Sequence, residues 1–237
     1  MVTTRTVEYE RGGKTYEGLL ATPGGDGPFP SVLICHAWAG RSEHEENVAK
    51  RLAGLGYAAL AGDVYGKGVR GGSKEENQAL MEPLVSDRTG SLNGVLAAAL
   101  AALDAQPETA PRPVVAGYCF GGLCALDVAR ARLGVRGAAA FHAILGEDGA
   151  PEGGNIEARV IAFQGFDDPM ATPEDLTAFG QEMTRRQADW RLHVFGGVMH
   201  AFTNEDADDP DFGTVYDAEA DARSWAAFET FLQECFA

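Results

Sequence analysis

The stretch from Val114 to Gly122 combines a reactive side chain with a backbone pattern that would expose it. It reads Val-Val-Ala-Gly-Tyr-Cys-Phe-Gly-Gly, so Cys119 stands between Gly117 and Gly121. An apolar run precedes the cysteine and a helical pattern follows, which is the spacing of a nucleophile elbow with cysteine where serine is usual. Such a turn strains its central residue and needs glycine two positions to either side. The following helix would direct its positive end at the thiol, so we expect Cys119 to be a nucleophile.

The other three cysteines fit simple packing. Cys35 ends an apolar run, and Cys124 and Cys235 lie on apolar faces of expected helices; free cysteine is among the most buried residue types. Two alternatives to catalysis stay open. Cys119 could act in a thiol redox protein, with Cys124 as its disulfide partner, or the chain could be a catalytically idle scaffold that binds a small molecule.

A thiol nucleophile needs a base and an acid that orients the base, and both are present after expected strands. Asp167 and Asp168 follow a strand over 158–164, and His200 follows a strand over 190–195. With the cysteine, this gives the chain order nucleophile, acid, base of an α/β-hydrolase. We expect His200 to be the base and Asp168 the acid, because Asp168 stands three residues past the turn glycine while Asp167 caps or solvates the turn.

An oxyanion hole would need two backbone N–H groups. One should come from Phe120, directly after the nucleophile, and one from the loop after the strand over 31–35. In that loop we expect the N–H of Trp38 to serve, with Ala37 as the alternative.

Further residues are candidates for the substrate pocket. His36 is either a second base or a brace for its loop, and His142 ends its own strand and either lines the pocket or packs. Tyr118, beside the nucleophile, is a further candidate. Arg88, like Arg70, is either an anion binder or an ordinary surface residue.

The elements that must position these groups follow from the periodicity of the sequence. Residues 6–20 alternate like an antiparallel hairpin, and strands and helices alternate from residue 31 onward. This predicts a mostly parallel sheet of about seven or eight strands with helices on both faces, in the α/β class. Reactive groups should gather at the carboxyl ends of its strands. The expected strands are 31–35, 58–64, 113–117, 137–142, 158–164 and 190–195, and the expected helices are 43–55, 75–84, 88–105, 120–132, 173–186 and 218–236.

Length and composition set the wider frame. The 237 residues suit a single domain, 1–237, and the formal net charge of −16 argues against nucleic acid or an anionic membrane surface as a partner. We expect neither a signal peptide nor a membrane span, because residues 1–5 lack the apolar region of a signal peptide and no apolar run reaches membrane-spanning length. Four cysteines without framework spacing favour the cytoplasm. We expect a monomer or a small homo-oligomer. The acidic segment 205–211 is expected to be a solvated loop.

The chain resembles the dienelactone hydrolase (carboxymethylenebutenolidase) family. The resemblance is carried by Gly-Tyr-Cys-Phe-Gly-Gly at 117–122, Gly-x-x-Asp-Pro at 165–169 and Gly-x-x-His-Ala-Phe at 197–202, and it covers roughly residues 14–236. It implies an α/β-hydrolase without a large cap and without a cofactor. A metal site is not expected either, because no two His or Cys residues share ligand spacing on one element. The resemblance also implies a Cys–His–Asp triad that hydrolyses a small-molecule ester or lactone.

Two positions depart from the family pattern. The family carries a glutamate in the loop after strand 31–35, where this chain has Ala37, and it carries an arginine shortly after the catalytic histidine, where this chain has Thr-Asn-Glu at 203–205. These departures favour a substrate other than a dicarboxylate-like lactone.

Overall fold

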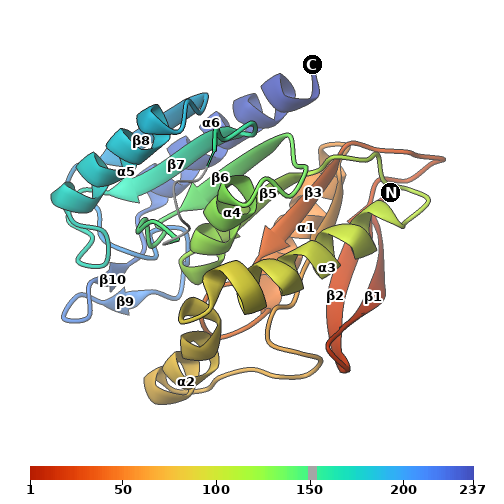
Figure 1. The fold of residues 1–237 in the computed structure, drawn as a ribbon, viewed down its shortest axis with the longest axis horizontal. Helices are drawn as coiled ribbons and strands as arrows, with labels where there is room; N and C mark the ends of the chain where they lie inside the picture. Colours follow the sequence, from red (N-terminus) through yellow and green to blue (C-terminus); the bar gives the residue numbers. More distant parts are fainter. Residues whose placement is uncertain (149–153) are drawn as a thin grey trace.

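The computed structural model of the chain describes residues 1–148 and 154–237, and within them the main feature is an eight-stranded sheet. The strand order is β1-β2-β4-β3-β5-β6-β7-β8, with β1 and β2 forming one edge (Figure 1). The strands are β1 (Thr3–Arg11), β2 (Lys14–Thr22), β3 (Ser31–Cys35), β4 (Ala58–Ala61), β5 (Val114–Tyr118), β6 (Gly137–Phe141), β7 (Arg159–Gly165) and β8 (Trp190–Phe195).

The pairing of the strands follows the expected pattern. β1 and β2 form an antiparallel hairpin, β2 pairs antiparallel with β4, and all strands from β4 to β8 pair in parallel. β3, β4, β5 and β6 are buried along their whole length, which explains why their sequences are continuous apolar runs. The expected mostly parallel α/β sheet with an antiparallel N-terminal hairpin is confirmed.

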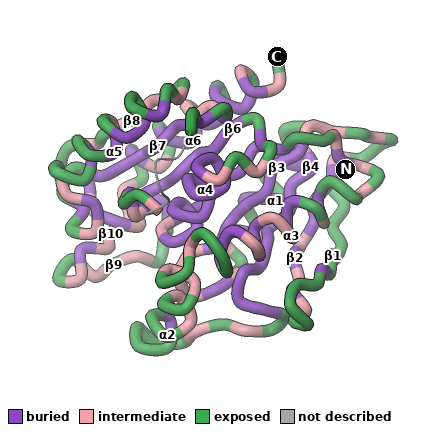
Figure 2. Tube along the Cα trace, in the orientation of Figure 1, coloured by how far each residue is buried: buried purple, intermediate pink, exposed green. Residues whose placement is uncertain are grey.

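Helices cover both faces of the sheet. Side chains of α3, α4 and α5 pack with one face, and side chains of α1 and α6 pack with the other. Figure 1 shows these layers, and Figure 2 shows that buried segments concentrate in the central strands and α4. The helices are α1 (Glu43–Gly54), α2 (Lys74–Val85), α3 (Asn93–Asp104), α4 (Phe120–Arg130), α5 (Pro173–Arg185) and α6 (Ala218–Phe236).

Two segments differ from expectation. The helix expected over 88–105 is divided into a short π-helix, η1 (Arg88–Leu92), and α3, and Asp87 caps η1 by accepting a hydrogen bond from the N–H of Ser91. The acidic segment 205–211 is not wholly a solvated loop, because part of it forms a small antiparallel hairpin from β9 (Asp208–Asp209) and β10 (Thr214–Val215).

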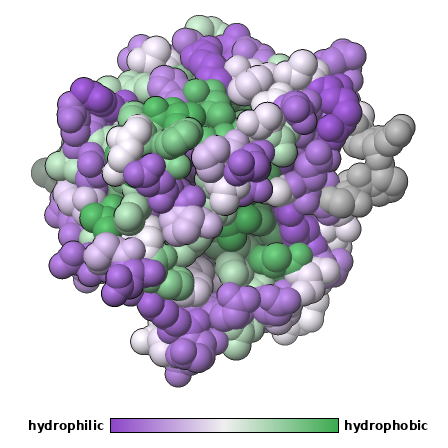
Figure 3. Space-filling model, turned by 90° about the vertical axis from the view of Figure 1, so that its left-hand side faces the viewer, coloured by the Kyte–Doolittle hydropathy of each residue, from purple (hydrophilic) through white to green (hydrophobic). Residues whose placement is uncertain are grey.

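The surface is mainly hydrophilic. On the face drawn in Figure 3, patches of hydrophobic residues lie between larger hydrophilic areas. Among the helices within 1–148 and 154–237, none is long and apolar enough to cross a membrane.

Candidate active site

The turn between β5 and α4 holds Cys119 in a backbone conformation that residues other than glycine rarely adopt, with φ 55° and ψ −117°. Two close approaches explain the glycines around it. A Cβ on Gly117 would lie 2.0 Å from the carbonyl oxygen of Gly121, and a Cβ on Gly121 would lie 2.1 Å from that of Cys35. Any larger residue would therefore push the turn apart, and the strained elbow depends on both glycines.

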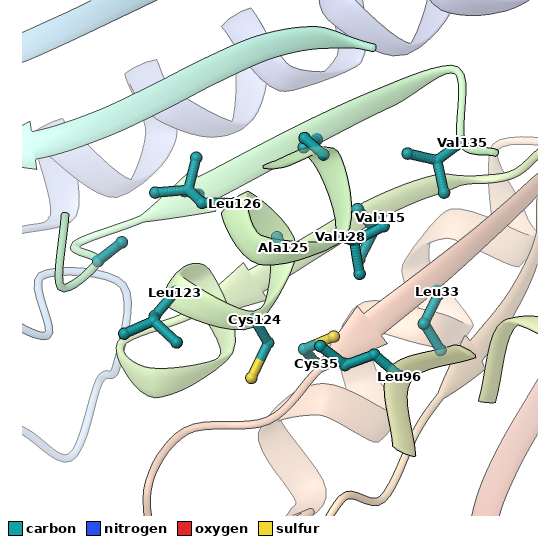
Figure 4. Close-up of a cluster of buried hydrophobic side chains, with 14 of the residues drawn as sticks. Leu33, Cys35, Leu96, Val115, Leu123, Cys124, Ala125, Leu126, Val128 and Val135 are labelled. Carbon is teal, nitrogen blue, oxygen red and sulfur yellow. The ribbon is translucent and has the colours of Figure 1, made fainter. Parts of the chain in front are cut away.

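The surroundings of Cys119 differ from those of the other cysteines. Cys119 is partly exposed and stands at the N-terminus of α4, where the partial positive charge of the helix favours an anion. Cys35, Cys124 and Cys235 are buried, and burial raises the pKa of the Cys35 thiol to about 12. Figure 4 shows Cys35 and Cys124 among the apolar side chains packed around α4. These two thiols belong to the core.

A buried histidine and aspartate meet at the ends of β7 and β8. Nδ1 of His200 lies 2.8 Å from Oδ2 of Asp168, and each residue is only 2% exposed. The other carboxylate oxygen of Asp168 accepts the N–H of Met170 at 2.8 Å. The neighbouring Asp167 is exposed. The carboxylate is therefore fixed by two contacts and holds the imidazole with Nδ1 as a hydrogen-bond donor.

Backbone packing explains why these two turns meet. The N–H of Asp167 donates to the carbonyl of Val198 at 3.0 Å, and a Cβ on Gly165 would lie 2.2 Å from that same carbonyl. On its other side, His200 is bridged to Thr214 of β10, because its N–H donates to Gly213 at 2.9 Å. The histidine is thus fixed by its own turn and by the small hairpin.

The electrostatics favour a protonated His200. Burial by itself lowers its pKa, but the negative charge of Cys119 and the hydrogen bond and charge of Asp168 outweigh burial and raise the pKa to about 10. Nε2 has no partner with full hydrogen-bond geometry among the described residues. Contacts of this kind are often long or misaligned in a free enzyme and tighten when substrate binds. The contribution of Cys119 to this pKa indicates that its thiol lies close to the imidazole of His200.

The loop after β3 is held by a buried carboxylate. Oε1 of Glu45 accepts the N–H of Ala37 at 3.3 Å, and Oε2 accepts the N–H and hydroxyl of Ser42, each at 2.8 Å. The N–H of Ala37, the alternative oxyanion donor expected from the sequence, is therefore already occupied. No hydrogen bond between described residues uses the N–H of Trp38 or of Phe120. Sequence reasoning missed Glu45, although Ser-x-x-Glu at 42–45 is a capping-box pattern that could have drawn attention to it.

The side chains open into a cavity of about 810 Å³. Its walls are mostly apolar or aromatic, with three histidines and three carboxylates, and no lysine or arginine is among the described residues that line it. The lining includes Ala37, Trp38, Met81, Tyr118, Cys119, Ile144, Met170 and Phe212, the histidines His44, His142 and His200, and the acidic residues Glu43, Glu45 and Asp206.

The β9–β10 hairpin forms one wall of this cavity. The ring of Phe212 stacks on Trp38, with centroids 5.8 Å apart and planes at 16°. Nζ of Lys74 in α2 lies over the ring of Phe212, 3.8 Å from its centroid, and donates a hydrogen bond to Oδ2 of Asp209 at 2.9 Å. Sequence reasoning did not find this wall, since two-residue strands give no periodic signal.

The pocket candidates from the sequence fall into two groups. Tyr118 and His142 line the cavity. His36 does not: it is fully buried, and its Nε2 accepts the N–H of Val64 at 3.2 Å, so it braces the loop. Arg88 also lies elsewhere, because its guanidinium pairs with Asp127 through bonds of 2.7 and 2.6 Å. No local pattern in the sequence indicates this buried carboxylate partner.

A parallel sheet with a nucleophile elbow after one strand and a His–Asp pair after two later strands defines the α/β-hydrolase class. The chain belongs to the dienelactone hydrolase family, whose sequence model matches residues 16–236. It is accordingly a hydrolase that acts on ester or lactone bonds.

Known proteins agree with this assignment. The solved structure of m3DLH superposes with a TM-score of 0.94 and 33% identity, covering 100% of this chain and 99% of that one. A dienelactone hydrolase-like promiscuous phosphotriesterase from metagenomic libraries gives a TM-score of 0.93 and 33% identity, covering 99% and 98%. An uncharacterized protein of Caenorhabditis elegans is 38% identical over 158 residues, which are 65% of this chain and 100% of that protein.

Proposed function

We propose that the hydrolysis proceeds through a Cys–His–Asp triad and an acyl-enzyme intermediate. The observation that supports the proposal most is the 2.8 Å contact between Nδ1 of His200 and Oδ2 of Asp168. Further support is that His200 and Cys119 line the same cavity. In this arrangement Cys119 is the nucleophile, His200 moves protons and Asp168 orients His200.

The acylation step begins with a thiolate–imidazolium pair. Sγ of Cys119 attacks the carbonyl carbon, and the carbonyl oxygen becomes an oxyanion that the N–H groups of Trp38 and Phe120 stabilise. When the C–O bond to the leaving group breaks, the imidazolium of His200 donates its proton to the departing oxygen. The products are a thioester on Cys119, a neutral His200 and an alcohol; with a lactone, the alcohol stays attached to the acyl chain.

Deacylation reverses these roles. Neutral His200 takes a proton from water, and the resulting hydroxide attacks the thioester carbon. The C–S bond then breaks, and the thiolate of Cys119 and the imidazolium are restored as the carboxylic acid leaves. No cofactor enters this scheme.

The wall of the cavity supports a substrate class. Because Glu43, Glu45 and Asp206 are among the residues that line the cavity and no described lining residue is cationic, an anionic ester would be repelled. We therefore infer uncharged esters or lactones as substrates, in preference to acids of the dicarboxylate type. His142 and Tyr118 complete the substrate pocket.

A second activity has support from one relative. The metagenomic phosphotriesterase, 33% identical over nearly all of both chains, is described as promiscuous. An uncharged phosphotriester carries a P=O oxygen that the same two N–H groups could stabilise after attack by Cys119, so we infer that such triesters are secondary substrates.

The redox alternative has less support. Cys124 is fully buried in the core, and burial raises the pKa of its thiol well above the ordinary value, which disfavours the thiolate that disulfide exchange needs. A panel of uncharged p-nitrophenyl and alkyl esters tests the proposal: Cys119→Ala should abolish turnover, whereas Cys124→Ala should retain it. A cytoplasmic location, a monomer or small oligomer, a single domain and the absence of nucleic-acid or membrane partners stay predictions from composition.

A further inference from the structure

His142 occupies a strained position that the surrounding structure holds firmly. Its φ is 38°, in the left-handed region that residues other than glycine rarely adopt. The N–H of His142 donates to Phe163 at 2.8 Å. The buried amide of Gln164 clasps the next residue, accepting the N–H of Ala143 at 2.7 Å and donating to its carbonyl at 2.8 Å. Strain that is maintained by several hydrogen bonds beside a reactive site indicates a function for the residue.

The imidazole of His142 has one nitrogen paired and one free. Nε2 lies 2.9 Å from the hydroxyl oxygen of Thr203. Nδ1 is buried and has no hydrogen-bond partner of acceptable geometry among the described residues, although the residue is only 3% exposed and lines the cavity. Its own backbone carbonyl contributes only the smallest influence on its pKa. A buried polar atom without a partner calls for an explanation, and at a cavity wall a bound ligand can supply the missing partner.

The environment also selects the protonation state. Burial, and next the charges of His200 and His44, hold the pKa of His142 well below the ordinary value, so the ring is neutral near pH 7. Either atom can donate in this contact; we assign the hydroxyl of Thr203 as the donor and Nε2 as the acceptor, because that hydroxyl makes no other hydrogen bond with described residues. A neutral imidazole that accepts at Nε2 carries its proton on Nδ1. His142, one of the residues that line the cavity, therefore carries a buried N–H donor at Nδ1 that has no acceptor of acceptable geometry among the described residues.

The ring of His142 lies next to that of His200, which is the proposed proton carrier. The rings of His142 and His200 meet edge to face, with centroids 5.0 Å apart. An oxygen that receives a proton from His200 is thus within the space that both rings border. We propose that Nδ1–H of His142 donates a hydrogen bond to the leaving-group oxygen of the bound ester or lactone, and so stabilises the negative charge that develops there. This inference rests on the proposed function; His142 keeps its own proton throughout, and His200 supplies the one that is transferred.

Two substitutions test the roles of Nδ1 and Nε2 of His142 separately. The amide of His142→Asn places a polar atom near the position of Nδ1 but cannot reach Thr203, and asparagine tolerates a positive φ. The longer His142→Gln places its amide near the position of Nε2 and leaves that of Nδ1 empty. We expect His142→Asn to retain most of the activity and His142→Gln to lose about 10- to 100-fold in kcat/KM on alkyl esters.

The dependence of activity on the leaving group distinguishes hydrogen bonding to the leaving-group oxygen from a purely structural role of His142. An alkoxide needs stabilisation as it departs, whereas p-nitrophenolate is already a stable anion. With ethyl and p-nitrophenyl esters of the same acid, the loss in His142→Gln should be at least several-fold larger for the ethyl ester. Equal losses on both esters, or better activity in His142→Gln than in His142→Asn, would overturn the inference.

A second measurement needs no variant. Nitrogen-15 NMR of histidine-labelled wild-type protein near pH 7 should show a neutral His142 ring protonated at Nδ1, and a ring protonated at Nε2 would overturn the inference. If the proposed Cys–His–Asp triad is wrong, ester turnover would survive Cys119→Ala, whatever the behaviour of the His142 variants. That outcome is distinct from a failure of the inference about His142.

Discussion

Asp168 and His200, which are 32 residues apart in the chain, meet through an Oδ2–Nδ1 contact of 2.8 Å with both residues 2% exposed. Among the described residues, the donors to this buried carboxylate are the imidazole and the N–H of Met170. The pairing gives His200 a fixed tautomer and a high affinity for a proton, which are the two properties a base beside a thiol requires.

Asp168→Asn should reduce kcat by about 100- to 10,000-fold with little change in KM, because the amide no longer fixes the tautomer of His200. Steady-state kinetics on an uncharged ester measures the effect. Asp167→Asn is the matched control: this neighbour is exposed, and its substitution should leave kcat within about twofold. A larger effect at 167 than at 168 would reverse the assignment of the acid.

Alkylation should distinguish Cys119 from the other thiols. One equivalent of iodoacetamide should modify Cys119 first and remove esterase activity in proportion, since Cys35, Cys124 and Cys235 are buried. Peptide mapping by mass spectrometry identifies the site. Parallel loss of all four thiols in the folded protein would contradict an activated nucleophile.

The pKa of His200 should depend on Cys119. NMR titration of labelled histidines should give a midpoint at about 10 in the wild type, and a lower one in Cys119→Ala because the negative charge of the thiolate is lost. Because the pKa of His200 in the folded state lies above the ordinary 6.5, protonation of His200 stabilises the folded protein. This stabilisation is complete below about pH 6.5 and is lost as the pH rises through about 10. The same midpoint in both proteins would show that the two side chains do not interact.

Glu45→Gln should disturb the oxyanion loop without disturbing the thiol. The amide cannot accept from both Ala37 and Ser42 as the carboxylate does, so the N–H of Trp38 loses its fixed position and kcat should fall about 10- to 100-fold. The alkylation rate of Cys119, which needs no oxyanion hole, should stay unchanged. Glu46→Gln on the same helix is the control, because Glu46 is not among the described residues that line the cavity, and it should leave both rates unchanged. Equal losses in turnover and alkylation would assign Glu45 a general structural role instead.

The charge of the cavity predicts selectivity between esters of similar size. An uncharged ester should exceed a hemisuccinate ester by at least about tenfold in kcat/KM. Asn204→Arg, which places a cation on the cavity wall, should narrow this gap, because Asn204 lines the cavity. A preference of the wild type for the anionic ester would contradict the proposed substrate class.

The chain order of the elements and the glycine frame of Cys119 could be predicted from the sequence, because both depend on local patterns. Periodicity located the strands, and the steric needs of the turn are met by Gly117 and Gly121. The boundaries of the last strand and helix, 190–195 and 218–236, agree with the structure.

Long-range contacts could not be predicted in the same way. Nothing local indicates that Phe212 stacks on Trp38, or that Arg88 turns from the cavity to the buried carboxylate of Asp127. The break at η1 is equally hidden, because residues 88–92 continue a pattern that reads as one long helix. Such features depend on which side chains meet in three dimensions, and sequence spacing alone does not specify them.

The proposed covalent step can be observed directly. The protein is mixed with an excess of a p-nitrophenyl ester, quenched in acid within the first turnovers, digested and analysed by mass spectrometry. The account predicts that the acyl mass is found on the peptide containing Cys119 and disappears on further incubation. Turnover in Cys119→Ala at the wild-type rate, or an acyl group on another residue and none on Cys119, would contradict it.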